Sequence, residues 1–365
     1  MPQSSGLRPK VRGLVGLTFA IILGLAAPAQ AQPQPAPGVA RVGPPISLPE
    51  AGLNAPLWVP RKPPDPNRKL TFRSLPLRFG TSSIQLSNGE EVVDLRDWAA
   101  VAVTDVDSEE SCTLTLVGPA VVLLAAHCVD AGYPPGTSGE GTIGGKVVFG
   151  SQGAYQLRHC GMPAAYKQWT ASPVGAPRSS ADYALCELDH KVSGVAPESI
   201  RYTASVAVGV KIRLMGSGCI DLGISDTGDY IWKDGKRLLR MGYDSVEATG
   251  ISLLPTQPGL YLRTLSSGSK EPVLCFGDSG GPVTLDVASG GRRVVAVNSG
   301  VGATNTATPK APAFYSYLSP LAAADFQAFL LEWAGPATPD PLHPAPAVRI
   351  ICGYNRPAGI QGCRS

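Results

Sequence analysis

Several features that would point to a function are scarce or missing in this sequence. Only four histidines occur among 365 residues, and no CxxC pair is present, which argues against a structural zinc site. The 31 basic and 28 acidic residues nearly cancel, and no long run of lysine or arginine occurs, so nothing indicates binding to nucleic acid or to a membrane surface. No repeat of fixed period is found. With 44% hydrophobic residues the chain is predicted to be globular, and no cofactor is implied.

Long apolar runs are also missing, with one exception near the N-terminus. Three basic residues precede an apolar run at 14–27, and Ala29-Gln30-Ala31 then offers small residues at the usual cleavage spacing. We predict a signal peptide over residues 1–31, and therefore a soluble protein that is secreted or periplasmic. An uncleaved membrane anchor is the alternative, but the run is short for a bilayer span and ends at Pro28.

Cysteine usage agrees with export. The sequence has eight cysteines, and an even number behind a signal peptide indicates disulfides. Counting alone leaves about 105 connectivities open. The cysteines are Cys112, Cys128, Cys160, Cys186, Cys219, Cys275, Cys352 and Cys363.

Composition divides the rest of the chain into three parts. Residues 32–83 are rich in Pro, Ala and Gly, which predicts a pro-segment or linker. Residues 84–335 hold short apolar runs separated by turn residues, a pattern that favours a β-sandwich or barrel. One helix is expected at 322–333, where apolar residues follow helical spacing before Gly335-Pro336. Residues 336–365 form a tail.

A glycine-rich turn, CFGDSGGPV at 275–283, contains the best candidate nucleophile. Such a turn is conformationally costly, so a requirement beyond packing is expected to select it. Ser279 lies in its centre, and a serine hydroxyl needs a base, usually histidine, and a carboxylate that orients the base. His127, in LLAAHC, is the candidate base, although an isolated histidine in such a place is more often structural.

Three segments together resemble the chymotrypsin-like (trypsin-like) serine protease family. They are SCTLTLVGPAVVLLAAHC, DYALCEL and CFGDSGGPV, and they come in that family's order of His, Asp and Ser. The stretch CTLTLVGP is similar to secreted bacterial members. The resemblance implies an all-β fold of two packed six-stranded antiparallel β-barrels, at about 84–205 and 206–335, with a C-terminal helix and an active site in the cleft between the barrels.

The same resemblance implies a role for each motif residue. Ser279 would attack the substrate carbonyl, His127 would take its proton, and Asp182 would orient the imidazole. The N–H groups of Gly277 and Ser279 would form the oxyanion hole. Asp278 would pair with a newly exposed N-terminal amine, although an ordinary turn carboxylate is the alternative.

The resemblance also suggests how the cysteines pair. Cys112 and Cys128 look like the family's bridge beside the catalytic histidine. We further expect Cys160 with Cys186 on neighbouring strands, Cys219 with Cys275 near the active-site turn, and Cys352 with Cys363 in a small loop of the tail.

The sequence departs from the family at two places. No basic residue precedes Leu86, the position that best matches the family's mature N-terminus, so maturation would use another protease or a different N-terminus. The substrate-cleft segment, usually Ser-Trp-Gly, is matched to Asn298-Ser299-Gly300, and we expect it to have lost that serine and tryptophan. Asn298, Gly300 and Val273 are the predicted substrate-binding residues. Because Val273 stands where a charged pocket base would be, a neutral residue is expected at the cleavage site.

We therefore predict a secreted serine endopeptidase that acts as a monomer on protein or peptide substrates. A non-catalytic binding protein on the same scaffold is one alternative. A second is an α/β-hydrolase esterase, because 277–281 also fits G-x-S-x-G. That fold needs a helix after the serine, whereas Pro282-Val283-Thr284-Leu285 has the pattern of a strand. His159 and His190 are expected to be surface or strand-edge residues.

Overall fold

The computed structural model describes part of the chain, all of it within one compact unit, Pro49–Ser365. The predicted signal peptide at 1–31 lies outside the described residues. No helix of the described part is long and apolar enough to cross a membrane. The described residues are 70–73, 86–92, 95–104, 112–130, 144–149, 153–166, 180–219, 221–224, 230–233, 238–251, 260–266, 271–288, 290–303, 313–336, 349–360 and 362–365.

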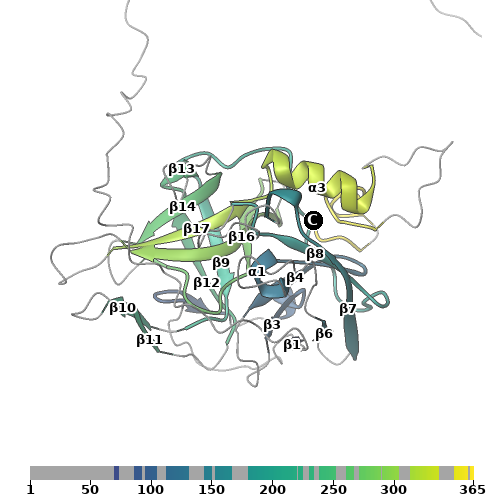
Figure 1. The fold of residues 1–365 in the computed structure, drawn as a ribbon, viewed down its shortest axis with the longest axis horizontal. Helices are drawn as coiled ribbons and strands as arrows, with labels where there is room; N and C mark the ends of the chain where they lie inside the picture. The colour runs from purple at the N-terminus through teal and green to yellow at the C-terminus, as the bar shows by residue number, and fades with distance from the viewer. Residues whose placement is uncertain are drawn as a thin grey trace, which may run out of the picture. The chain divides into compact units, whose positions relative to one another are not determined.

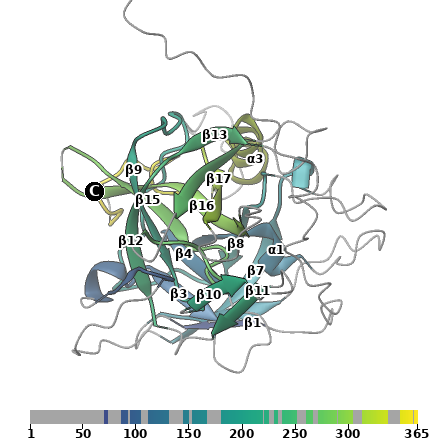
Figure 2. The ribbon, with the colours of Figure 1, turned by 90° about the vertical axis from the view of Figure 1, so that its left-hand side faces the viewer.

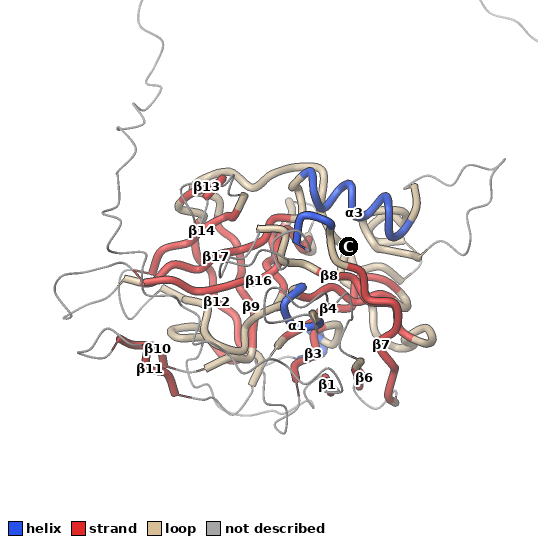
Figure 3. Tube along the Cα trace, in the orientation of Figure 1, coloured by secondary structure: helices blue, strands red, loops and turns tan. Residues whose placement is uncertain are grey.

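Strands dominate the described residues, as the short apolar runs predicted (Figures 1 and 3). Seven of them close into the first barrel, in the order β1-β3-β4-β5-β8-β7-β6. They are β1 (Leu70–Arg73), β3 (Val101–Thr104), β4 (Thr113–Gly118), β5 (Val121–Leu124), β6 (Gly145–Val148), β7 (Ala154–Gly161) and β8 (Ala184–Leu188). Short helical segments accompany them, among them η2 (Leu95–Trp98) and α1 (Ala126–Val129).

The second barrel is built on an eight-stranded sheet in the order β13-β14-β17-β16-β15-β9-β12-β2 (Figure 2). A separate two-stranded sheet pairs β10 (Asp221–Ile224) with β11 (Tyr230–Lys233). The strands of the large sheet are β2 (Glu90–Glu91), β9 (Lys211–Gly216), β12 (Arg240–Ser245), β13 (Ala248–Ile251), β14 (Tyr261–Ser266), β15 (Pro282–Asp286), β16 (Arg292–Ala303) and β17 (Phe314–Pro320).

The fold prediction is confirmed, with one correction at the start of the first barrel. Residues 70–73 were assigned to a pro-segment or linker, but they form β1, which pairs parallel with β6 and antiparallel with β3. Leu70 and Phe72 are 1% and 0% exposed, so this strand supplies part of the barrel core. The first barrel therefore begins before residue 84 and has seven strands.

The predicted C-terminal helix is α3 (Ala324–Ala334), which ends at Gly335 with a positive φ of 77°. Its apolar side packs against the first barrel, although it follows the last strand of the second. Phe326 is fully buried, and its ring meets Tyr183 edge to face with centroids 4.7 Å apart. Burying such aromatic surface stabilises the contact, so α3 ties the end of the second barrel to the first.

All cysteines of the chain are paired. The four disulfides are Cys112–Cys128, Cys160–Cys186, Cys219–Cys275 and Cys352–Cys363, which are the four pairs that the sequence analysis expected.

Candidate active site

His127 and Asp182 come together through the pairing of β5 with β8. The two strands pair Leu124 with Ala184, which brings α1, just after β5, beside the residues that precede β8. His127 Nδ1 lies 2.7 Å from Asp182 Oδ2, and the His127 main-chain N–H donates to Oδ1 over 3.0 Å. An ionised carboxylate only accepts hydrogen bonds, so Nδ1 carries the hydrogen and Nε2 is left with its lone pair for a proton.

Ser299 adds a third hydrogen bond to the same carboxylate. Its hydroxyl donates to Asp182 Oδ2 over 2.6 Å, and Asp182 is 0% exposed. Ser299 lies in β16 where the pairing with β17 shifts register between Asn298 and Gly300. Such a bulge re-aims a side chain, and here the serine reaches from the second barrel to a carboxylate of the first.

The sequence analysis missed this role of Ser299. We expected the cleft serine to have been lost, but Ser299 stands in its place, and Gly300 is the residue where tryptophan would follow. The available signal was the serine in VNSG. If the family's cleft serine is matched to Ser299 instead of Asn298, the serine is kept. A bulge of one residue hides that register from any reading of strand periodicity.

The turn that carries Ser279 docks on the first barrel beside His127. The Ser279 carbonyl accepts a hydrogen bond of 2.7 Å from Thr113 N–H at the start of β4. It also lies 3.9 Å from the Sγ of Cys128, the neighbour of His127 on α1. The structure therefore brings Ser279 to the two elements that flank the His127–Asp182 pair.

The main-chain N–H groups of this turn fall into two sets. Asp278 N–H donates to Cys275 O and Gly280 N–H to Asn298 O. Within the described residues, by contrast, the N–H groups of Gly277 and Ser279 donate to no protein acceptor. Gly277 has φ of 105°, a left-handed conformation that glycine adopts without strain. The arrangement suits an oxyanion bound by two main-chain donors.

Comparison with known proteins decides the family. A family model described as Trypsin matches residues 87–324, more than half of the chain. The chain belongs to the trypsin family. Among curated proteins no significant match exists.

Two solved structures illustrate what the chain is similar to. One is a Glu endopeptidase in complex with MPD, 18% identical, covering 67% of this chain and 95% of that chain with a TM-score of 0.41. Another is a mutant of human heparin binding protein, 15% identical, covering 71% of this chain and 99% of that chain with a TM-score of 0.40.

Asp278 has different partners from those that the trypsin-family resemblance implied. Its Oδ1 accepts from Gly218 N–H and its Oδ2 from Cys275 N–H, both over 2.7 Å. Burial is the largest influence and raises the pKa of Asp278 to about 6, against these two hydrogen bonds and the positive charge of Arg240. A Cβ on Gly216 would overlap the carboxylate, so the wall around it is built of small residues. All of these partners lie inside the second barrel.

The raised pKa of Asp278 predicts a specific dependence of stability on pH. Between about pH 4 and 6 the folded protein holds a proton on Asp278 that the unfolded chain releases, because the folded pKa is about 6 against an ordinary 3.8. The stabilising contribution is complete below about pH 4 and falls by about 3 kcal/mol as the pH rises through 6. Denaturant unfolding of wild type and Asp278→Asn at several pH values measures it. The wild-type advantage should shrink across this window, and parallel curves for the two proteins would contradict the prediction.

Two of the predicted substrate-binding residues, Asn298 and Val273, are buried. Asn298 is 0% exposed, and its Nδ2 donates to Met215 O over 2.7 Å and to Asp278 O over 3.1 Å. Asn298 therefore holds the nucleophile turn in place and is not exposed to a substrate, which corrects its predicted role in substrate binding. Val273 is 1% exposed, and its N–H pairs with Ser87 O. Among the described residues, apart from its neighbours in the chain, none lies within 4 Å of a Cβ built on Gly300, so there is space beside this residue.

The two other histidines that the structure describes, His159 and His190, make their contacts elsewhere, and His343 lies outside the described residues. His190 has a side chain 59% exposed and pairs with Asp189 over 2.8 Å. His159 lies in β7, where its main-chain oxygen accepts from Trp333 Nε1.

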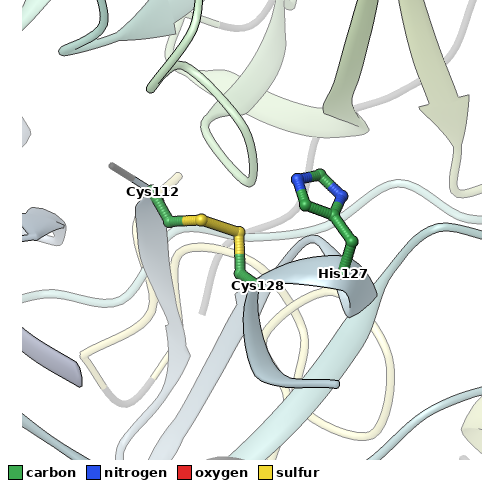
Figure 4. A group of neighbouring side chains, drawn as sticks. All are labelled: Cys112, His127 and Cys128. Atoms are coloured by element: carbon green, nitrogen blue, oxygen red, sulfur yellow. A yellow bond between two sulfur atoms is a disulfide. The ribbon is translucent and has the colours of Figure 1, made fainter. Parts of the chain in front are cut away.

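One group beside the triad has the composition of a metal site. One ligand atom each from Cys112, His127 and Cys128 lies within 4.8 Å of the others. Figure 4 shows, however, that the two sulfurs are joined as a disulfide, which links Cys112, the residue before β4, to the helix that carries His127. Cysteine binds a metal only as a thiolate, so these two disulfide-bonded cysteines supply no ligand, and the bridge holds the helix of His127 against the chain before β4.

Proposed function

We propose that this trypsin-family protein is a serine endopeptidase that is exported from the cell. The observation that supports it most is the fully buried Asp182 carboxylate, which accepts from both His127 and Ser299 while the Ser279 turn docks alongside. A buried carboxylate with these donors is the arrangement that holds a histidine as general base. Four disulfides support the proposal of export, because they persist in oxidising compartments.

Each residue has a defined step in the proposed reaction. Ser279 Oγ attacks the scissile carbonyl carbon while its proton passes to His127 Nε2, and Asp182 stabilises the imidazolium that forms. The N–H groups of Gly277 and Ser279 hold the carbonyl oxygen as it becomes negative. His127 then gives the proton to the leaving amine, which departs and leaves an acyl group on Ser279. Water, deprotonated by His127, hydrolyses that ester and restores the serine.

A fluorophosphonate probe tests this function directly. Ser279 Oγ attacks phosphorus and fluoride leaves, so intact mass spectrometry should show one adduct on the wild type and none on Ser279→Ala. An adduct on both proteins, or on neither, contradicts the proposed role of Ser279. The absence of an adduct on folded wild type would favour a non-catalytic binding protein on the same scaffold.

The same mass measurement locates the mature N-terminus. We propose that the mature chain begins upstream of Leu70, because β1 supplies buried residues to the first barrel and Asp278 has partners within the second barrel. A mature chain that begins at Leu86 would have lost β1 and would contradict this proposal.

The cleavage preference is proposed to be for neutral residues. Val273, at the position of the pocket base, carries no charge, so a lysine or arginine side chain would lose hydration without gaining an ion pair there. A peptide library should show cleavage after apolar residues to be at least about tenfold more efficient than after Arg, the effect of about 1.4 kcal/mol. Equal efficiency after Arg and after Leu or Phe would contradict the preference.

A further inference from the structure

The end of the chain is a folded part of the molecule, although its sequence resembles no part of the family. The residues in question, 349–360 and 362–365, are called the clasp below, and they lie beyond the region that the Trypsin model matches. Figures 1 and 2 mark the end of this segment with the letter C. The disulfide Cys352–Cys363 closes its loop, and Ile351 and Cys352 are 0% exposed. Such burial indicates a specific docking position.

One end of the clasp is bound to the first barrel. Cys352 N–H donates to Val117 O in β4 over 2.8 Å, and Arg349 Nε lies 3.2 Å from Glu187 Oε2 in β8. A Cβ on Gly118 would overlap Ile350 O, so the main chains approach so closely here that only glycine fits.

Both ends of the disulfide loop in the clasp are bound to the segment that connects the two barrels. Ile200 N–H donates to Cys352 O over 2.8 Å, and Arg364 N–H donates to Pro197 O over 2.9 Å. Ser199 Oγ donates to Arg364 O over 2.5 Å. These hydrogen bonds fix the connecting segment from both ends of the disulfide loop.

The last two residues of the clasp reach the second barrel. Arg292 N–H, at the start of β16, donates to Ser365 O over 3.3 Å. The carboxylate of Glu198, 0% exposed, is shared between two arginines: Arg292 Nη2 lies 2.6 Å and Arg364 Nε 3.3 Å from its Oε1. A buried carboxylate is costly unless it is paired, so Glu198 holds one arginine of the second barrel and one of the clasp together.

This placement matters because the active site is split between the barrels. His127 and Asp182 belong to the first barrel, whereas Ser279 and Ser299 belong to the second. Two of the described hydrogen bonds join the barrels at the active site. Thr113 N–H donates to Ser279 O, and Ser299 Oγ donates to Asp182. Reacting groups must be held to within a fraction of an ångström, so any relative shift of the barrels lowers the rate.

We propose that the clasp is a positioning element that holds the two barrels in the relative position that the active site needs. The proposal rests on the proposed function for its catalytic consequence, but its structural part is measured independently. Its contacts run from β4 and β8 through the connecting segment to β16, and they lie outside the triad.

A chain that ends at Cys363 tests the proposal. It lacks only Arg364 and Ser365, so it keeps the disulfide and the contacts with the first barrel. It loses the hydrogen bonds of Arg364 with Pro197 and Ser199 and the contacts with Glu198 and Arg292. Hydrogen exchange reports alignment through the Thr113 amide, which bonds across the barrels to Ser279 O. The Leu116 amide, bonded to Ala100 O within the first barrel, is the internal reference. Ile360→Ala, at a loop position 49% exposed, is the matched control variant.

In the shortened chain, the exchange rate of the Thr113 amide should rise at least about tenfold while that of Leu116 stays unchanged. The rate of fluorophosphonate labelling should fall about tenfold although the shortened chain is fully folded. Ile360→Ala should match the wild type in both. Unchanged exchange at Thr113, or an equal rise at Thr113 and Leu116, overturns the proposal, because the second result means general destabilisation. If the shortened chain does not fold, Arg364→Ala takes its place, with Arg364→Lys expected to restore alignment. If the wild type is never labelled, the proposed function fails while the exchange measurement still decides on the clasp.

Discussion

Asp182→Asn is expected to lower kcat for peptide cleavage by about 10⁴-fold, the size of loss that this change causes in a serine protease triad. Asp182 accepts three hydrogen bonds, from His127 Nδ1, from the His127 main chain and from Ser299 Oγ. An amide has one oxygen and offers N–H donors in place of the second. It therefore cannot accept all three, and a donor that faces Nδ1 would force the hydrogen of the ring onto Nε2, where the base is needed.

The chain offers a matched control for this substitution at the other end of the same strand. Asp189 follows β8 and pairs with His190, so Asp189→Asn also removes a carboxylate from a His–Asp contact. It should leave kcat within about twofold, because the pair is solvated and holds no reacting group. Steady-state kinetics on a peptide that the wild type cleaves, with thermal unfolding to verify folding, compares the two. Similar losses in both variants would show that Asp182 has no special role.

The triad residues could be proposed from the sequence because each lies in a short motif with its own local chemistry. GDSGGP needs glycines around Ser279 for a left-handed turn, and AAHC puts a cysteine beside His127. Neither property depends on the rest of the fold. The strands were visible for a similar reason, since β4 and β5 are short, apolar and bounded by turn residues.

Features that depend on distant partners could not be found in this way. LTFR at 70–73 has only four residues in a Pro-rich region, and it becomes a strand because β3 and β6 complete a barrel around it. Ser299 reaches Asp182 because of a bulge in β16. The positive charge of Arg240 lowers the pKa of Asp278 only because the fold brings the two residues together. The clasp depends on Glu198, a residue far from it in sequence. Sequence periodicity reports only on residues that are close along the chain, so these contacts between distant residues could not be predicted from it.

Gly280→Ala is expected to lower kcat by at least about 10²-fold, through displacement of the Ser279 turn. Gly280 has φ of 83°, and a Cβ there would overlap Thr113 O and lie 2.9 Å from Ala125 N. Both are main-chain atoms of the first barrel, one at the strand that binds Ser279 O and the other at the start of α1. Relief of the overlap must therefore move either the nucleophile or the helix that carries His127.

The left-handed conformation alone costs about 1 kcal/mol for a residue with a Cβ, and a second glycine separates that cost from the overlap. Gly290 has φ of 79°, but no atom lies within 4 Å of a Cβ built there. Gly290→Ala should therefore lower the free energy of unfolding by about 1 kcal/mol and leave kcat unchanged, whereas Gly280→Ala should lower both. Chemical denaturation and steady-state kinetics on the two variants measure each quantity. If Gly280→Ala keeps wild-type kcat, the close approach of the turn to β4 and α1 does not set the position of Ser279. If both variants lose kcat equally, backbone strain rather than the contact between barrels governs the rate.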